Sequence, residues 1–140
     1  MAVDQTRLIK AAKKSLLAEH FHQAAEVSIL LVNDEEMQAM NSKYRGIDRP
    51  TDVLSFSQMD EGSAPFEDSP VILGDIVISV DTAERQAVSR GEPVDDELDM
   101  LVVHGILHLL GYDDETDEKS EIMLSRQAVI LNGIRNGRRQ

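Results

Sequence analysis

Residues 71–80 read Val-Ile-Leu-Gly-Asp-Ile-Val-Ile-Ser-Val, a run rich in β-branched residues that decides the fold of the chain. A short apolar run of this kind, bounded by turn residues, is typical of a strand buried in a sheet. Asp81 directly follows and can cap a helix that runs to about Arg90. A proline then opens a second and more apolar helix, which we expect over 93–111.

The same kinds of pattern assign the rest of the chain. They predict helices over 6–21, 34–41 and 117–134, strands over 26–32 and 51–57, and loops over 43–50 and 58–70. Asn33, with Glu36 three residues later, is a capping-box-like start for the helix at 34–41. The last residues, 136–140, are expected to form a frayed basic tail. These elements predict an α/β (α+β) fold in one compact domain over 1–140, with a small mixed sheet of three to four strands packed against four to five helices.

The composition excludes several classes of function. The 140 residues contain no cysteine, which excludes a thiol nucleophile, a disulfide framework and a cysteine-bound zinc site. No apolar run approaches the roughly 20 residues that span a bilayer, and the N-terminus lacks the apolar core of a secretory signal. We therefore expect a cytoplasmic protein with no membrane partner.

The charge is strongly acidic, with a formal net charge of −12. An acidic chain is a poor nonspecific binder of nucleic acid, because contacts to phosphate dominate that affinity. Binding of RNA would need a local basic surface, and its candidates are Lys43, Arg45 and Arg49 in one loop with Arg7, Lys10, Lys13 and Lys14 on the first helix.

His104 and His108 carry the clearest chemical signal in the sequence. They are four residues apart on a predicted helix, so both imidazoles project from the same face, one turn apart. Gly111 can end that helix in a left-handed conformation and bring a following carboxylate back, from Asp113, Asp114 or Glu115. Two histidines and one carboxylate with an open position are a known catalytic zinc arrangement. The alternative is a pair of core histidines with no ligand.

Gly105, between the two histidines, adds to this signal. A glycine inside a helix costs about 1 kcal/mol relative to alanine, so we expect something to approach the backbone closely there. The same glycine stands where a metalloprotease of the HExxH type has its general-base glutamate, which argues against that mechanism.

Arg45 is the second candidate, in the loop before the strand at 51–57. A guanidinium held there could clamp a phosphate or stabilise a developing oxyanion. The alternative is a surface arginine paired with Asp48 or Asp52.

Three blocks together resemble the YbeY family of bacterial rRNA-maturation endoribonucleases. They are HGILHLLGYD at 104–113, YRGIDRPTDVLSF at 44–56 and LGDIVIS at 73–79, in matching order and spacing. The resemblance implies a single metal-dependent endoribonuclease domain that cuts single-stranded rRNA in small-subunit maturation and ribosome quality control. Its partners would be rRNA, the small ribosomal subunit and assembly factors, with no DNA. It implies one zinc ion on His104 and His108, with Arg45 in the same cleft, so that Arg45, His104 and His108 carry the catalysis.

One position departs from the family pattern. The family motif ends in a histidine that is the third metal ligand, and Asp114 stands there in this chain. Either Asp114 coordinates the ion, or water fills the gap, or the site binds metal weakly. An oxygen ligand could also shift the preference from zinc toward manganese or magnesium.

The expected mechanism is metal-assisted phosphodiester cleavage, with Arg45 holding the phosphate and either water or the RNA 2′-hydroxyl attacking. Two other functions remain open from the sequence. One is a zinc hydrolase acting on a substrate other than RNA, and the other is a ribosome-assembly binding factor whose metal is structural.

Overall fold

The buried run at 71–80 forms the central strand of a three-stranded sheet. In the computed structural model, which describes residues 3–58 and 70–138, β3 (Val71–Ser79) lies between β1 (Ala25–Val32) and β2 (Val53–Ser57). β1 pairs with β3 in parallel, and β2 pairs with β3 antiparallel. The predicted mixed sheet is therefore confirmed. Most of the loop expected over 58–70 falls outside the described residues.

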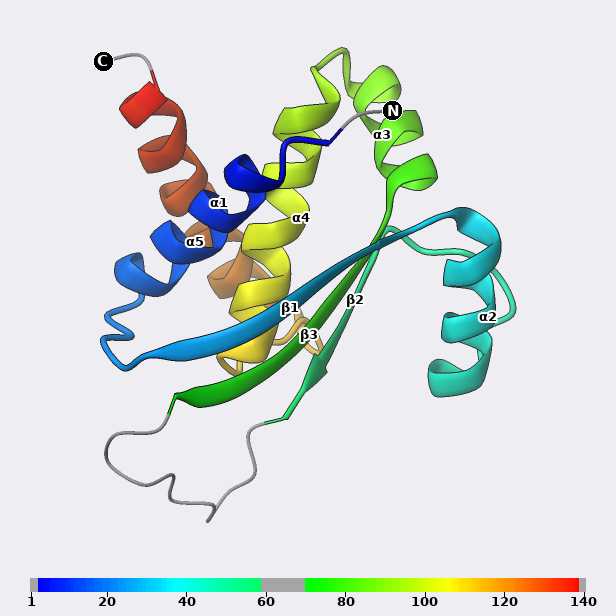
Figure 1. Ribbon diagram of the computed structural model, residues 1–140, viewed down its shortest axis with the longest axis horizontal. Helices are drawn as coiled ribbons and strands as arrows, with labels where there is room; N and C mark the ends of the chain where they lie inside the picture. The colour runs from blue at the N-terminus through cyan, green and yellow to red at the C-terminus, as the bar shows by residue number, and fades with distance from the viewer. Residues whose placement is uncertain (1–2, 59–69, 139–140) are drawn as a thin grey trace.

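Five helices complete the described chain, and α4 (Val94–Leu109) is the one around which the core forms (Figure 1). α4 contacts α1 (Gln5–Ala18), α3 (Val80–Arg90), α5 (Asp117–Arg138) and strands β2 and β3. A helix surrounded in this way must be apolar on most of its faces. Its buried apolar residues are Leu98, Leu101, Val102, Val103, Ile106, Leu107 and Leu109.

The two faces of the sheet are covered unequally. Ile76 and Ile78 of β3 belong to the large core that contains α4, whereas Val77, between them, belongs to a smaller cluster with Met37 of α2 (Asp34–Arg45). This alternation is what the two-residue period of a strand dictates. Helices α1, α4 and α5 therefore lie on one face, and α2 covers one end of the other (Figure 1).

One position in β3 requires glycine because the neighbouring strand approaches it closely. Gly74 has φ +145°, and an added Cβ would lie 2.1 Å from the carbonyl oxygen of Phe56 on β2. Beside it the register of β1 against β3 shifts between Glu26 and Val27. The glycine thus permits both the close approach of β2 and the irregular register with β1 at this point of the strand.

The first residues of helices α2 and α3 are set by N-cap side chains, and for α3 the cap differs from the predicted one. α2 begins after Asn33, whose side chain accepts a hydrogen bond from the backbone of Glu36, as predicted. α3 is capped by Ser79 rather than by Asp81, because β3 turns directly into the helix. Asp34 of α2 lies beside the junction between β3 and α3. Its carboxylate accepts hydrogen bonds from Ser79, Thr82 and Arg85 at 2.6–2.7 Å.

The C-terminal helix extends further than the sequence predicted. α5 reaches Arg138 instead of ending near residue 134, and the frayed tail expected over 136–140 is wrong as far as Arg138. The reason is a long-range ion pair. Arg138 and Arg7 both donate hydrogen bonds to Asp99, a buried carboxylate of α4. Two helices from opposite ends of the chain are thereby fixed to the central one. Residues 139–140 lie outside the described residues.

Among the described residues no helix is both long enough and apolar enough to cross a membrane.

Candidate metal and RNA site

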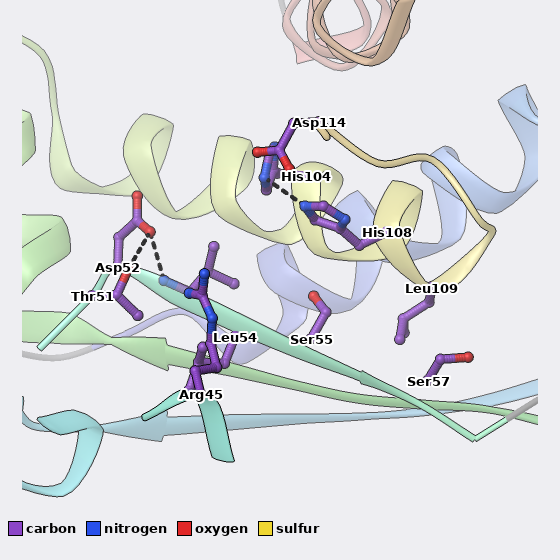
Figure 2. Close-up of a pocket in the computed structure, with 11 residues that line it drawn as sticks. Arg45, Thr51, Asp52, Leu54, Ser55, Ser57, His104, His108, Leu109 and Asp114 are labelled. Carbon is purple, nitrogen blue, oxygen red and sulfur yellow. Dashed lines mark hydrogen bonds between the residues drawn. The ribbon is translucent and has the colours of Figure 1, made fainter. Parts of the chain in front are cut away.

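The candidate site residues share one cleft of about 430 Å³ between strand β2 and helix α4. Arg45, His104, His108 and Asp114 all line it, together with hydroxyl-bearing residues such as Ser55 and Ser57 (Figure 2). β2 is an edge strand of the sheet, so the cleft is open along that edge. The sequence predicted these four residues on three separate segments, and the fold brings them to one cleft.

The two histidines face each other on the last turns of α4. Their Nε2 atoms are 3.1 Å apart and the ring centroids 4.7 Å apart, with the rings nearly perpendicular (Figure 2). Both side chains are partly buried. Burial and the neighbouring His104 lower the pKa of His108, so that this imidazole is neutral at neutral pH. Neutral imidazole is the form that binds a metal.

The second nitrogen of each ring has an oxygen partner. His104 Nδ1 lies 2.8 Å from the side-chain oxygen of Gln127, and His108 Nδ1 lies 3.1 Å from the backbone carbonyl of Tyr112. When both Nδ1 atoms donate to these oxygens, the two Nε2 atoms are bare and face each other, an arrangement that favours a cation between them.

This donor pair fits a zinc ion. Two nitrogens bound tetrahedrally to zinc at about 2.0–2.1 Å are roughly 3.3 Å apart, close to the observed separation. A carbonyl or carboxylate that accepts from the other ring nitrogen is the usual support of a metal-binding histidine. The alternative, two core histidines without a ligand, would account for the same separation by a hydrogen bond from Nε2–H of one ring to Nε2 of the other.

The position of a third metal ligand is less well defined than that of the two histidines. Asp114 is exposed, lies in the same cleft and raises the pKa of His108 by its charge, but that residue and the histidines do not form a compact ligand cluster. Over residues 3–58 and 70–138, no three His, Asp or Glu side chains are grouped closely enough to hold an ion. Gly111, at φ +104°, makes the predicted turn that brings Asp114 back over α4. Asp114 as a ligand stays a prediction.

Gly105 has a structural explanation. An added Cβ would lie 2.9 Å from two side-chain carbons of Ile76, so the close neighbour that the sequence predicted is the central strand. The carbonyl of Gly105 also accepts a hydrogen bond from Ser55 Oγ at 3.4 Å. The glycine thus lets α4 lie directly on the sheet and sets the depth of the histidines in the cleft.

Arg45 is the last residue of α2 and not part of a loop, because the helix continues to Gly46 before it stops. Its side chain is exposed and lines the cleft. None of the ion pairs within the described ranges involves Arg45, so the expected alternative of pairing with Asp48 or Asp52 is wrong. Asp52 instead accepts from the backbone of Val53 at 2.7 Å.

Sequence reasoning missed Gln127. It belongs to α5 and lies 23 residues after His104. A signal was present, since Met123, Ile130 and Ile134 are buried at helical spacing and Gln127 is the polar member of that stripe.

A solved structure has the same fold. The solution structure of TM1509 from Thermotoga maritima superposes with a TM-score of 0.64 at 29% identity, covering 99% of this chain and 88% of that one. The fold therefore places the protein in a known class of small α/β domains.

The sequence comparisons identify the family. Residues 2–135 match the family model described as Endoribonuclease YbeY. The chain is 50% identical over 112 residues to the Endoribonuclease YbeY of Bacillus licheniformis, covering 77% of this chain and 71% of that protein. It is 42% identical over 137 residues to that of Pelotomaculum thermopropionicum, covering 96% and 90%. The chain belongs to the YbeY endoribonuclease family.

Proposed function

We propose that this protein is a metal-dependent endoribonuclease that cuts single-stranded rRNA during small-subunit maturation and ribosome quality control in the cytoplasm, with one zinc ion at His104 and His108. Family membership supports the endoribonuclease activity. The observation that carries the metal is the pair of Nε2 atoms 3.1 Å apart, each ring held by an oxygen on its other nitrogen.

His104 and His108 would hold the ion through Nε2, with Asp114 or a water as a further ligand. A bound divalent metal supplies Lewis acidity toward a phosphoryl oxygen and lowers the pKa of a bound water. With manganese or magnesium in place of zinc, the oxygen ligand at position 114 would carry more of the binding.

Arg45 would bind the scissile phosphate from the opposite side of the cleft. Its guanidinium is exposed, is not engaged by a carboxylate of the described chain and points into the same cleft as the histidines (Figure 2). A planar guanidinium can donate two hydrogen bonds to one phosphate and stabilise the charge that develops in the transition state. Ser57 lines the same cleft and would add a neutral hydroxyl donor, whereas the hydroxyl of Ser55 already donates to the carbonyl of Gly105.

The charge distribution supports an RNA contact confined to this region. At a net charge of −12 the rest of the surface repels a polyanion, so binding should depend on a few basic residues near the cleft. A cleft of about 430 Å³ along a sheet edge suits one strand whose phosphates can bend into it, which favours single-stranded RNA over a duplex.

A ribosome-assembly factor with a structural metal is the alternative from the sequence. Structural zinc sites use four protein ligands, and over residues 3–58 and 70–138 no three His, Asp or Glu side chains are grouped to hold an ion, so this observation does not favour that alternative. A catalytic role and a binding role differ in whether RNA is cut.

The test is cleavage of an end-labelled single-stranded RNA and of the matching duplex by wild type, Arg45→Ala and Arg135→Ala, a control on the far end of α5. We expect wild type and Arg135→Ala to cut only the single strand, and Arg45→Ala to lose about 10²–10³-fold in rate. Its melting temperature should be unchanged, because an exposed arginine contributes under about 1 kcal/mol. Arg45→Lys should also be impaired, since an ammonium cannot replace the planar donor pair.

Two results would contradict the proposal. Cleavage by Arg45→Ala at the wild-type rate would remove the assigned role of the arginine. Wild-type protein that binds single-stranded RNA but leaves it intact with every divalent metal supplied would favour the assembly factor.

A further inference from the structure

We propose that Gln127 is a positioning residue that holds His104 in the tautomer a metal ion requires, an inference that rests on the proposed metal site. Gln127 lies on α5, outside all three blocks that carry the resemblance to the family. Its side-chain oxygen is 2.8 Å from Nδ1 of His104.

The packing of α5 places Gln127 toward α4. Met123, Ile130 and Ile134 are buried on one stripe of α5, and Gln127 lies on that stripe four residues after Met123 and three before Ile130. Its side chain is partly buried, whereas the two residues that follow it, Ala128 and Val129, are exposed. A polar residue at such a position needs a hydrogen-bond partner, and His104 provides it.

The two histidines are not supported equally. The ring of His108 is oriented by the backbone carbonyl of Tyr112, which no side-chain substitution removes. The ring of His104 depends on a single side chain. Without an acceptor at Nδ1, His104 can carry its proton on Nε2 and donate it to Nε2 of His108, 3.1 Å away. That internal hydrogen bond would occupy both of the nitrogens that a metal needs.

Gln127 therefore selects between two states of the pair. With Nδ1 of His104 donating to Gln127, both Nε2 lone pairs are available to one ion. With the proton on Nε2, the pair is closed to a metal. Removing a partner of this kind from a metal-binding histidine typically costs 10–100-fold in metal affinity.

The test uses the full-length protein and two readouts. The first is the tautomer of the His104 ring in metal-free protein, from ring nitrogen NMR shifts at pH 8, where unperturbed imidazole is neutral. The second is the dissociation constant for zinc, from competition with a chelating dye. The variants are Gln127→Leu, which removes the acceptor at similar volume, and Gln127→Glu, which keeps an acceptor. Ser125→Leu is the control, at an exposed position on the same helix.

We expect Gln127→Leu to move the His104 proton from Nδ1 to Nε2 and to weaken zinc binding about 10–100-fold. Gln127→Glu should keep the proton on Nδ1 and bind zinc at least as tightly as wild type, and Ser125→Leu should match wild type in both readouts. An unchanged tautomer in Gln127→Leu would overturn the proposal whatever happens to zinc, and so would a changed tautomer with unchanged zinc affinity.

The experiment distinguishes a failure of the proposed metal site from a failure of the proposed role of Gln127. If wild type binds no zinc, the metal site of the proposed function is wrong, while the tautomer measurement in metal-free protein still decides whether Gln127 orients His104. If Gln127→Leu does not fold, the rescue variant Gln127→Glu gives the decision, because loss of the Nδ1 proton in that variant would contradict the role.

Discussion

Replacing Gly105 by alanine tests whether the contact between α4 and the central strand sets the position of the histidines. The new Cβ would lie 2.9 Å from Cδ1 and Cγ2 of Ile76 and 3.0 Å from its Cγ1. Ile76 is fully buried and β-branched, so its side chain cannot turn away freely. Overpacking of this kind costs about 1–3 kcal/mol, against a gain of about 1 kcal/mol from the better helix former.

The net expectation is a loss of up to about 2 kcal/mol in the free energy of unfolding, measured by urea denaturation. Gly133→Ala is the matched control. Gly133 also lies inside a helix, but an added Cβ there meets nothing within 4 Å, so that variant should gain up to about 1 kcal/mol. The two glycines thus separate helix propensity from packing.

A double-mutant cycle assigns the loss to Ile76. Ile76→Ala removes all three carbons that the new Cβ would meet, so its cost should be smaller in the Gly105→Ala background by about 1–2 kcal/mol. If Gly105→Ala proves as stabilising as Gly133→Ala, or if the cycle shows no coupling, the explanation of Gly105 by close packing is refuted.

Three further predictions concern single residues. Hydrogen bonds from Arg85 first, and then from its neighbours, lower the pKa of Asp34 to about 2. Because the pKa of Asp34 in the folded protein lies below its value in the unfolded chain, Asp34→Asn should lower the free energy of unfolding by about 1–2 kcal/mol at pH 7. The difference in stability between wild type and variant should vanish as the pH falls from 4 toward 2, which urea unfolding at pH 7 and at pH 2 would show. Asp99→Ala leaves two arginines without their buried partner and should cost about 2–4 kcal/mol by urea unfolding, whereas a loss under about 1 kcal/mol would mean that the pairs contribute little. Asp114→His restores the family ligand and should tighten zinc about tenfold or more by dye competition, and unchanged affinity would mean that residue 114 does not reach the ion.

Local signals in the sequence predicted most elements of the fold. The cap formed by Asn33 and the turn at Gly111 both occur as expected, because they depend on residues a few positions apart. Contacts between residues far apart in the sequence could not be predicted. The last turn of α5 depends on Arg138 meeting Asp99, 39 residues away, and no local pattern encodes that pair.

In the candidate site, too, features set by local sequence were predictable and features set by long-range packing were not. The histidine pair was predictable because four residues on a helix fix a shared face. Arg45 was assigned to a loop because glycine and proline follow it, although the helix stops only at Gly46. Gln127 was missed because its meaning depends on α5 packing against α4, even though its place in an apolar stripe was visible in the sequence.

A crystal structure of the full chain grown with zinc, with anomalous data at the zinc edge, tests the central claim most directly. The proposed metal site predicts one peak in the cleft, within bonding distance of Nε2 of both His104 and His108, at about 2.0–2.1 Å. A map with no anomalous peak between the two rings at saturating zinc would contradict the metal site.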